Sequence, residues 1–235
     1  MIYKQYLKGS LNPLNLFSVL AYKRNFKKEH PDYFWPDGLL TFCGSQGKGK
    51  TLSAVQYCRK ILENYPNCKF YTNVDIKDLP YPERVFEYTG LDCLKDENGE
   101  YGILYLIDEI HLEWNSLESK NITIEEMTEF AQQRKQRKHI VGTSQVFTRI
   151  AKPLREQMKY VVLCKNFASI LQFNTLIDGD TVVEKDGEMS YNVLGHSLWF
   201  HTPALYQSYD TYAKMKRYKK EWQGHPYDPT RGGSR

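Results

Sequence analysis

The stretch LLTFCGSQGKGKT, from Leu39 to Thr51, decides the fold of this chain. Its first five residues are an apolar run of strand length, and the glycine-rich residues that follow break that run. Apolar residues then recur at Leu52, Val55 and Cys58, a spacing that places them on one face of a helix. The segment therefore predicts a strand, a loop and a helix in succession.

The loop fits the P-loop pattern GxxxxGK[ST] at every required position. In such a loop the backbone amides surround phosphate oxygens, and the helix N-terminus adds a field that favours anions. Lys50 would neutralise the charge of the β- and γ-phosphates of ATP, and Thr51 would hold Mg²⁺. The predicted nucleotide-binding residues are Gly44, Ser45, Gln46, Gly47, Lys48, Gly49, Lys50 and Thr51.

Two further segments place polar side chains directly after apolar runs. Tyr101–Ile107 is apolar on nearly every residue, as expected of a strand covered on both faces, and Asp108 and Glu109 follow it. Ligands of open α/β sheets sit at the carboxyl ends of the strands. Asp108 would hold the Mg²⁺ water shell, and Glu109 would polarise the attacking water. Gln145, after a predicted strand at His139–Ser144, would contact the γ-phosphate or that water.

The remaining elements favour an α/β fold with a mostly parallel sheet flanked by helices. A strand is predicted at Lys69–Val74. Thr123 to Glu126 is a capping box, which predicts a helix whose last turns carry Arg134, Arg137 and Lys138. Later strands and a hairpin are predicted at Tyr160–Cys164, at Leu171–Asn174 and at Thr181–Glu184 around Asp178–Asp180.

Length and composition indicate one principal domain. With 235 residues, of which 41% are hydrophobic, the chain can fill one full-sized core. We divide it into an N-terminal arm (1–37), an ATPase core (38–165), a C-terminal extension (166–222) and a loose tail (223–235). No apolar stretch is long enough to span a bilayer and no signal peptide is evident, which predicts a cytoplasmic protein. The five scattered cysteines predict reduced thiols.

Positive charge is concentrated in two segments. Residues 133–159 hold eight lysines and arginines against one acid, Glu156. Residues 212–235 hold seven against Glu221 and Asp228. Such segregation suits contact with a polyanion such as the DNA backbone, and solvated surfaces on opposite sides of a domain would produce it equally well.

Several motifs together resemble the zonular occludens toxin-like ATPases, which belong to the FtsK/HerA class of P-loop motors. The resemblance covers roughly residues 38 to 165. The segments that carry it are Gly44–Thr51, Tyr71–Val74, Ile107–Glu109, Arg134–His139, Thr143–Gln145 and Leu154–Arg155, with a weaker match at Ser208–Thr211.

The resemblance implies a RecA-like core that assembles into a homo-oligomeric ring, a hexamer or pentamer. It also implies that a basic residue before the strand that leads to Gln145 acts as an arginine finger in a neighbour's site. Arg134 and Arg137 match that position. Filamentous-phage assembly relatives carry a transmembrane helix after the ATPase domain, and this chain shows none, which favours relatives that move DNA.

Three functions remain open on the sequence. The first is an ATP-driven motor that translocates or packages the DNA of a virus or mobile element, in the host cytoplasm or at a virion vertex. The second is a filamentous-phage-type virion-assembly ATPase that acts on protein partners at a membrane. A viral portal, capsid or membrane protein is a candidate partner in either case. The third is a nucleotide-dependent switch with slow turnover. A small-substrate kinase is disfavoured, because Glu109 and Gln145 suit a water nucleophile.

Overall fold

The computed structural model describes residues 12–117, 122–185 and 188–209, and the chain divides after Tyr33 into two units. The first unit contains helix α2 (Pro13–Glu29). Asn12 caps this helix, since its side chain accepts a hydrogen bond of 3.0 Å from the Leu14 amide, and Pro13 fits the first helical position. No residue of α2 is buried within the described part of the chain.

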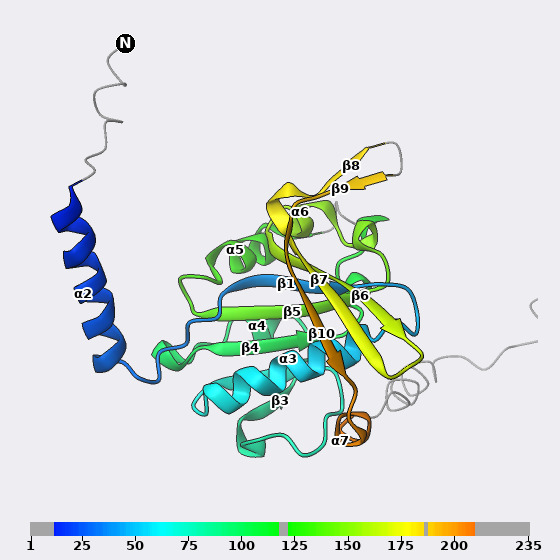
Figure 1. Ribbon diagram of the computed structural model, residues 1–235, viewed down its shortest axis with the longest axis horizontal. Helices are drawn as coiled ribbons and strands as arrows, with labels where there is room; N and C mark the ends of the chain where they lie inside the picture. Colours follow the sequence, from blue (N-terminus) through cyan, green and yellow to red (C-terminus); the bar gives the residue numbers. More distant parts are fainter. Residues whose placement is uncertain (1–11, 118–121, 186–187, 210–235) are drawn as a thin grey trace, which may run out of the picture. The chain divides into compact units, whose positions relative to one another are not determined.

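The described residues of the second unit form an eight-stranded mixed sheet in the order β10-β7-β6-β1-β5-β4-β2-β3 (Figure 1). The pairs from β6 to β3 are parallel, and β7 and β10 add antiparallel pairs at one end. A separate two-stranded sheet pairs β8 (Val183–Lys185) with β9 (Glu188–Ser190). The strands of the large sheet are β1 (Gly38–Cys43), β2 (Lys69–Thr72), β3 (Val85–Glu87), β4 (Ile103–Ile107), β5 (Lys138–Ser144), β6 (Met158–Phe167), β7 (Leu171–Asp178) and β10 (Val193–Phe200).

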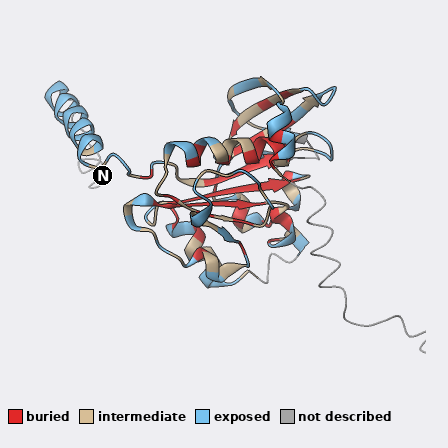
Figure 2. Cartoon of the chain, turned by 90° about the horizontal axis from the view of Figure 1, so that it is seen from below, coloured by how far each residue is buried: buried red, intermediate tan, exposed pale blue. Residues whose placement is uncertain are grey.

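Both faces of the central strands are buried (Figure 2). On one face, helix α3 (Lys50–Asn64) packs Val55 and Cys58 into a cluster that includes Leu104. On the other face, α5 (Ile124–Gln132) and α6 (Lys152–Arg155) contribute to a cluster around Tyr105. Burial of one such side chain contributes about 1.5–3 kcal/mol to folding. The continuous apolar character of β4 therefore reflects coverage from both sides.

Short helices complete the second unit. They are α4 (Leu91–Leu94) and α7 (Pro203–Gln207), with 3₁₀ turns η1 (Pro82–Arg84), η2 (Gly99–Tyr101), η3 (Ile110–Leu112), η5 (Phe147–Arg149) and η6 (Gly179–Thr181).

The predicted α/β fold with a mostly parallel sheet is confirmed. Strand β5 lies between β1, which precedes the glycine-rich loop, and β4, which precedes the two carboxylates. This insertion of one strand is the arrangement of RecA-like P-loop proteins. The sheet continues through residue 165 inside β6, and the division at residues 37, 165 and 222 stays a prediction.

The helix predicted from the capping box ends earlier than expected. The cap itself is confirmed, because the Thr123 hydroxyl accepts from the Glu126 amide at 3.2 Å and the Glu126 carboxylate accepts from the Thr123 amide at 2.7 Å. However, α5 stops at Gln132, and Arg134 and Arg137 lie in turns beyond it. Lys138 is the first residue of β5, and its buried ammonium group bonds the carbonyl of Leu94 and lies 3.4 Å from the Glu129 carboxylate. The chain must leave the helix to bring Lys138 to these partners.

The hairpin predicted around Asp178–Asp180 was wrong. Those residues leave β7 and enter the turn η6, where Gly179 packs so closely on β6 that an added Cβ would lie 1.9 Å from the Met158 carbonyl oxygen. The tight connection is instead the turn between β6 and β7, where Ala168 and Ser169 both adopt left-handed backbone angles. Strand β10 was not predicted.

Candidate active site

The P-loop connects the end of β1 to the start of α3. Gly47 and Gly49 both have φ of +76°, a conformation that glycine adopts without steric cost. Gly49 is the N-cap residue of α3, and no side chain caps this helix end. The first amides of α3 are therefore available to an anion. The Lys50 side chain is buried and its ammonium group bonds the Ser45 carbonyl at 3.3 Å, which holds it across the loop.

Asp108 is fixed at the end of β4 by three neighbours. Its Oδ1 accepts from the Thr51 hydroxyl at 2.9 Å and from the hydroxyl of Thr143 on β5. The side chain of Asn73, which follows β2, makes two hydrogen bonds to the Asp108 main chain. Its Nδ2 group donates to the Asp108 carbonyl at 3.1 Å, and its Oδ1 atom accepts from the Asp108 amide at 2.8 Å. Residues on or just after three neighbouring strands, β2, β4 and β5, thus hold Asp108 beside the first turn of α3.

Glu109 turns away from the strand because its backbone is left-handed, with φ of +55°. Its amide donates to the Thr143 hydroxyl at 2.9 Å, so that one hydroxyl positions both acidic residues. Its Oε2 atom lies 3.3 Å from Nδ1 of His111, and the same ring nitrogen lies 3.2 Å from the Ser144 hydroxyl. The Glu109 side chain is 20% exposed, and its Oε2 atom is buried beside His111 without a hydrogen-bond partner among the described residues.

These residues surround one cavity of about 500 Å³. The P-loop and α3 contribute Lys50 and Thr51 to its wall, β4 contributes Asp108 and Glu109, and the segment after β5 contributes Gln145. Gln46, Gly47 and Gly49 line it as well, together with His111 and Tyr209. The structure thus brings the segments predicted from three separate stretches of sequence into one hollow.

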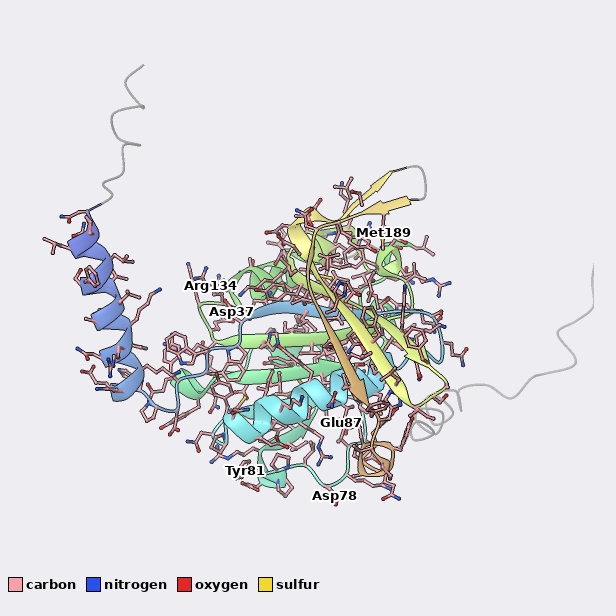
Figure 3. The ribbon with its side chains drawn as sticks, viewed as in Figure 1. Asp37, Asp78, Tyr81, Glu87, Arg134 and Met189 are labelled. Atoms are coloured by element: carbon pink, nitrogen blue, oxygen red, sulfur yellow. The ribbon has the colours of Figure 1, made fainter. Side chains whose placement is uncertain are left out.

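The structure places Arg134 and Arg137 elsewhere. Arg134 lies 3.5 Å from the carboxylate of Asp37, just before β1, and Figure 3 shows the two labelled side chains together at that edge. Arg137 bonds the Gly99 carbonyl at 3.2 Å. Since β1 and β5 are parallel and in register, these arginines stand at the start of the strands and the P-loop stands at their end. A seven-residue strand spans about 20 Å, so neither arginine reaches the cavity of its own chain.

The basic stretch of residues 133–159 does not form one surface. Lys138 is in the core, Arg134 and Lys159 pair with Asp37, and Lys152 pairs with Glu156. Residues 210–235, which hold the second basic stretch, lie outside the described residues.

Asn73, Thr143 and His111 were not predicted as site residues. Asn73 and Thr143 do belong to the segments Tyr71–Val74 and Thr143–Gln145 that carry the family resemblance, which was the available signal. His111 comes two residues after Glu109 and had no distinguishing pattern.

The polar groups of the cavity fit Mg²⁺ bound together with a nucleotide. Mg²⁺ keeps several waters and takes few protein ligands, mainly carboxylates and the phosphates of its substrate. Thr51 and Asp108 supply one hydroxyl and one carboxylate 2.9 Å apart. The described residues contain no group of three or more His, Cys, Asp or Glu that could hold a metal ion.

The two thiols beside the P-loop are neutral at physiological pH. Burial raises the pKa of Cys164 to about 12 and raises that of Cys43 further. Lys50 lowers both values, and burial outweighs it. All five cysteines are free, as predicted.

Strand order, loop and paired carboxylates define the class: the second unit has the fold of a RecA-like P-loop NTPase. The N-terminal domain of zonular occludens toxin from Neisseria meningitidis is similar, with a TM-score of 0.50 and 14% identity over 75% of this chain and 100% of that one. The genome packaging NTPase B204 from Sulfolobus turreted icosahedral virus 2, in complex with ATP-gammaS, gives 0.48 and 10% over 67% and 97%.

At these identities the likeness concerns the fold alone, and at that level the predicted resemblance to zonular occludens toxin-like ATPases is confirmed. No protein-family model and no curated protein matches the chain. Across the described residues, every helix is too short or too polar to cross a bilayer.

Proposed function

We propose that this chain is an ATPase that translocates or packages DNA, as a genome-packaging motor of a virus or mobile element. The observation that carries the proposal is the single cavity that joins an uncapped helix N-terminus, a buried lysine, the Thr51–Asp108 pair and Glu109. Phosphate binding, cation binding and activation of water are thereby available at one place.

The side chains have distinct roles in the proposed hydrolysis. The α3 amides and Lys50 bind the β- and γ-phosphates, and Thr51 and Asp108 hold Mg²⁺, which supplies charge neutralisation when bound. Glu109 accepts a proton from a water whose oxygen bonds the γ-phosphorus, while the bond from that phosphorus to the β–γ bridging oxygen breaks. ADP and phosphate leave. Gln145 orients the water or contacts the γ-phosphate.

The DNA part of the proposal rests on the distribution of charge. Arg149 and Lys152 are exposed in the connection from β5 to β6, and the segment 212–235 is strongly basic. No base-reading motif is present in the sequence, so contact would be with the phosphate backbone. Such a protein acts in the host cytoplasm or at a virion vertex.

A salt titration tests this contact. We expect binding of random duplex DNA to weaken a few hundred-fold between roughly 50 and 200 mM salt, because each neutralised phosphate contributes a slope of about −0.9 and four to six contacts are expected. Fluorescence anisotropy measures it. The test variant changes Lys214, Lys216, Arg217, Lys219 and Lys220 to Gln. The matched control changes five exposed lysines to Gln, namely Lys23, Lys27, Lys28, Lys60 and Lys77.

The test variant should lose most of the affinity and most of the salt slope, and the control should keep both. Unmeasurable binding of the wild-type protein at low salt would reject the DNA proposal and favour the assembly of protein partners at a membrane.

We further propose that Arg134 or Arg137 completes the site of a neighbouring subunit in a ring. The support is the position of both arginines where the central strands begin, at the opposite end of these strands from the P-loop. They could therefore reach a nucleotide only in another copy of the chain. An arginine finger supplied by a neighbour accelerates P-loop hydrolysis by about 10³ to 10⁵.

Mixing two inactive variants tests the ring. A Glu109→Gln protein keeps the arginines, and an Arg134→Ala/Arg137→Ala protein keeps the carboxylate. We expect each variant alone to hydrolyse ATP slowly and their mixture to recover part of the activity. In the mixture, some sites combine the Glu109 carboxylate of one chain with the arginines of the other. Specific activity of the wild type should also rise with protein concentration. Absence of complementation together with flat specific activity would contradict the proposal.

A further inference from the structure

A buried glutamine from the β6–β7 hairpin contacts the P-loop backbone. Gln172, on β7, is fully buried, and its Nε2 group donates to the carbonyl oxygen of Lys48 at 3.0 Å. Its Oε1 atom sits so close to Gly49 that a Cβ added there would lie 2.1 Å away. Gln172 and Lys48 are 124 positions apart in the chain. The side chain of Gln172 therefore fills the space next to Gly49, the N-cap residue of α3.

The orientation of the Gln172 amide is fixed by its partners. Nε2 faces two acceptors, the Lys48 carbonyl and Oδ1 of Asn174 at 2.8 Å, so this atom is the donor nitrogen. Oε1 then faces Nε2 of His201 at 3.2 Å, where an amide oxygen can only accept. Both polar atoms of the amide have partners, and rotation of the amide would turn its oxygen toward two acceptors, the Lys48 carbonyl and Asn174 Oδ1.

Neighbouring residues extend the same contact. Asn174 bonds the hydroxyl of Ser53 on α3 at 3.1 Å, and Asn166 on β6 bonds the Gly47 carbonyl at 3.5 Å. His201 is itself tied to the β6–β7 turn, since its amide donates to the Ile170 carbonyl at 2.8 Å. The hairpin thus holds the P-loop and the first turn of α3 through side-chain hydrogen bonds.

We infer that Gln172 is a positioning residue for the nucleotide site, which holds the P-loop backbone so that its amides stay directed at the phosphates. The inference rests on the proposed function, because it assigns the hairpin a role in ATP binding. Loss of the amide would remove the side-chain donor of the Lys48 carbonyl and would free the backbone at Gly49. The described hydrogen bonds of Gln172 go to Lys48, Asn174 and His201, whereas Asp108 and Glu109 follow a different strand, β4. Binding should therefore suffer more than turnover.

The test compares Gln172→Ala and Gln172→Met with the wild type. Methionine keeps the length and the packing but not the amide, so it preserves the test where alanine fails to fold. Thr175→Val is the matched control, because it removes a different side-chain hydrogen bond of β7, the one to His196 at 3.2 Å. We expect roughly ten- to hundred-fold weaker binding of mant-ATP with Mg²⁺ for both Gln172 variants. The control should bind like the wild type.

Two further readouts separate positioning from packing. KM for ATP should rise in the Gln172 variants while kcat at saturation stays within a few-fold. Hydrogen exchange without nucleotide should quicken at residues 44–51 and stay unchanged in β4. Wild-type affinity in both variants, or faster exchange throughout the sheet, would overturn the inference. Failure of the wild type to bind mant-ATP would instead overturn the proposed function.

Discussion

Replacement of Lys50 by alanine should abolish tight binding of ATP. The Lys50 side chain is buried across the P-loop, where its only described hydrogen bond goes to the Ser45 carbonyl, and it lines the cavity. Without Lys50, the described residues that line the cavity would include no lysine or arginine to face the negative charge of the β- and γ-phosphates. Removal of such a charged hydrogen-bonding partner costs several kcal/mol, so the affinity should fall at least about a hundred-fold.

Isothermal titration calorimetry with Mg²⁺ and a non-hydrolysable ATP analogue measures this loss. Lys60→Ala is the matched control, because Lys60 is an exposed lysine of the same helix. The control should bind as tightly as the wild type. Unchanged affinity in Lys50→Ala would show that nucleotide does not bind at the P-loop.

Replacement of Glu109 by glutamine should leave ATP binding intact and slow hydrolysis by roughly 10²-fold or more, as expected when a positioned general base is lost. Glutamine has the same shape and can keep the contact with His111, so the change removes basicity and little else. Phosphate release at saturating ATP is the measurement, with the exposed Glu63→Gln of α3 as the control. Equal turnover in wild type and Glu109→Gln would show that Glu109 has a structural role only.

The sequence predicted those parts of the site that depend on short, local residue patterns. The P-loop, the apolar strand before Asp108 and Glu109, and the strand before Gln145 each follow from neighbouring residues. In a parallel sheet the carboxyl ends of these strands meet at one edge, so their convergence needed no further information. The structure confirms the strands and their convergence at one cavity.

Contacts between distant segments could not be predicted in this way. The Gln172 contact with Lys48 depends on the pairing of β6 with β1 and β7, which no local pattern specifies. Strand β10 is largely exposed and contains Gly195, so it lacks the alternation by which strands are recognised. The early end of α5 depends on the partners of the buried Lys138 side chain, which are Glu129 on α5 itself and the Leu94 carbonyl on α4.

The most direct test of the DNA-motor proposal is the rate of phosphate release from Mg²⁺-ATP with and without random duplex DNA. We expect hydrolysis to rise on addition of DNA at roughly 50 mM salt and to lose this stimulation near 200 mM, because contacts with the DNA backbone weaken. In Glu109→Gln, hydrolysis should be slow with and without DNA. Hydrolysis that is indifferent to DNA at low salt would contradict the motor, and absence of hydrolysis would contradict the ATPase itself.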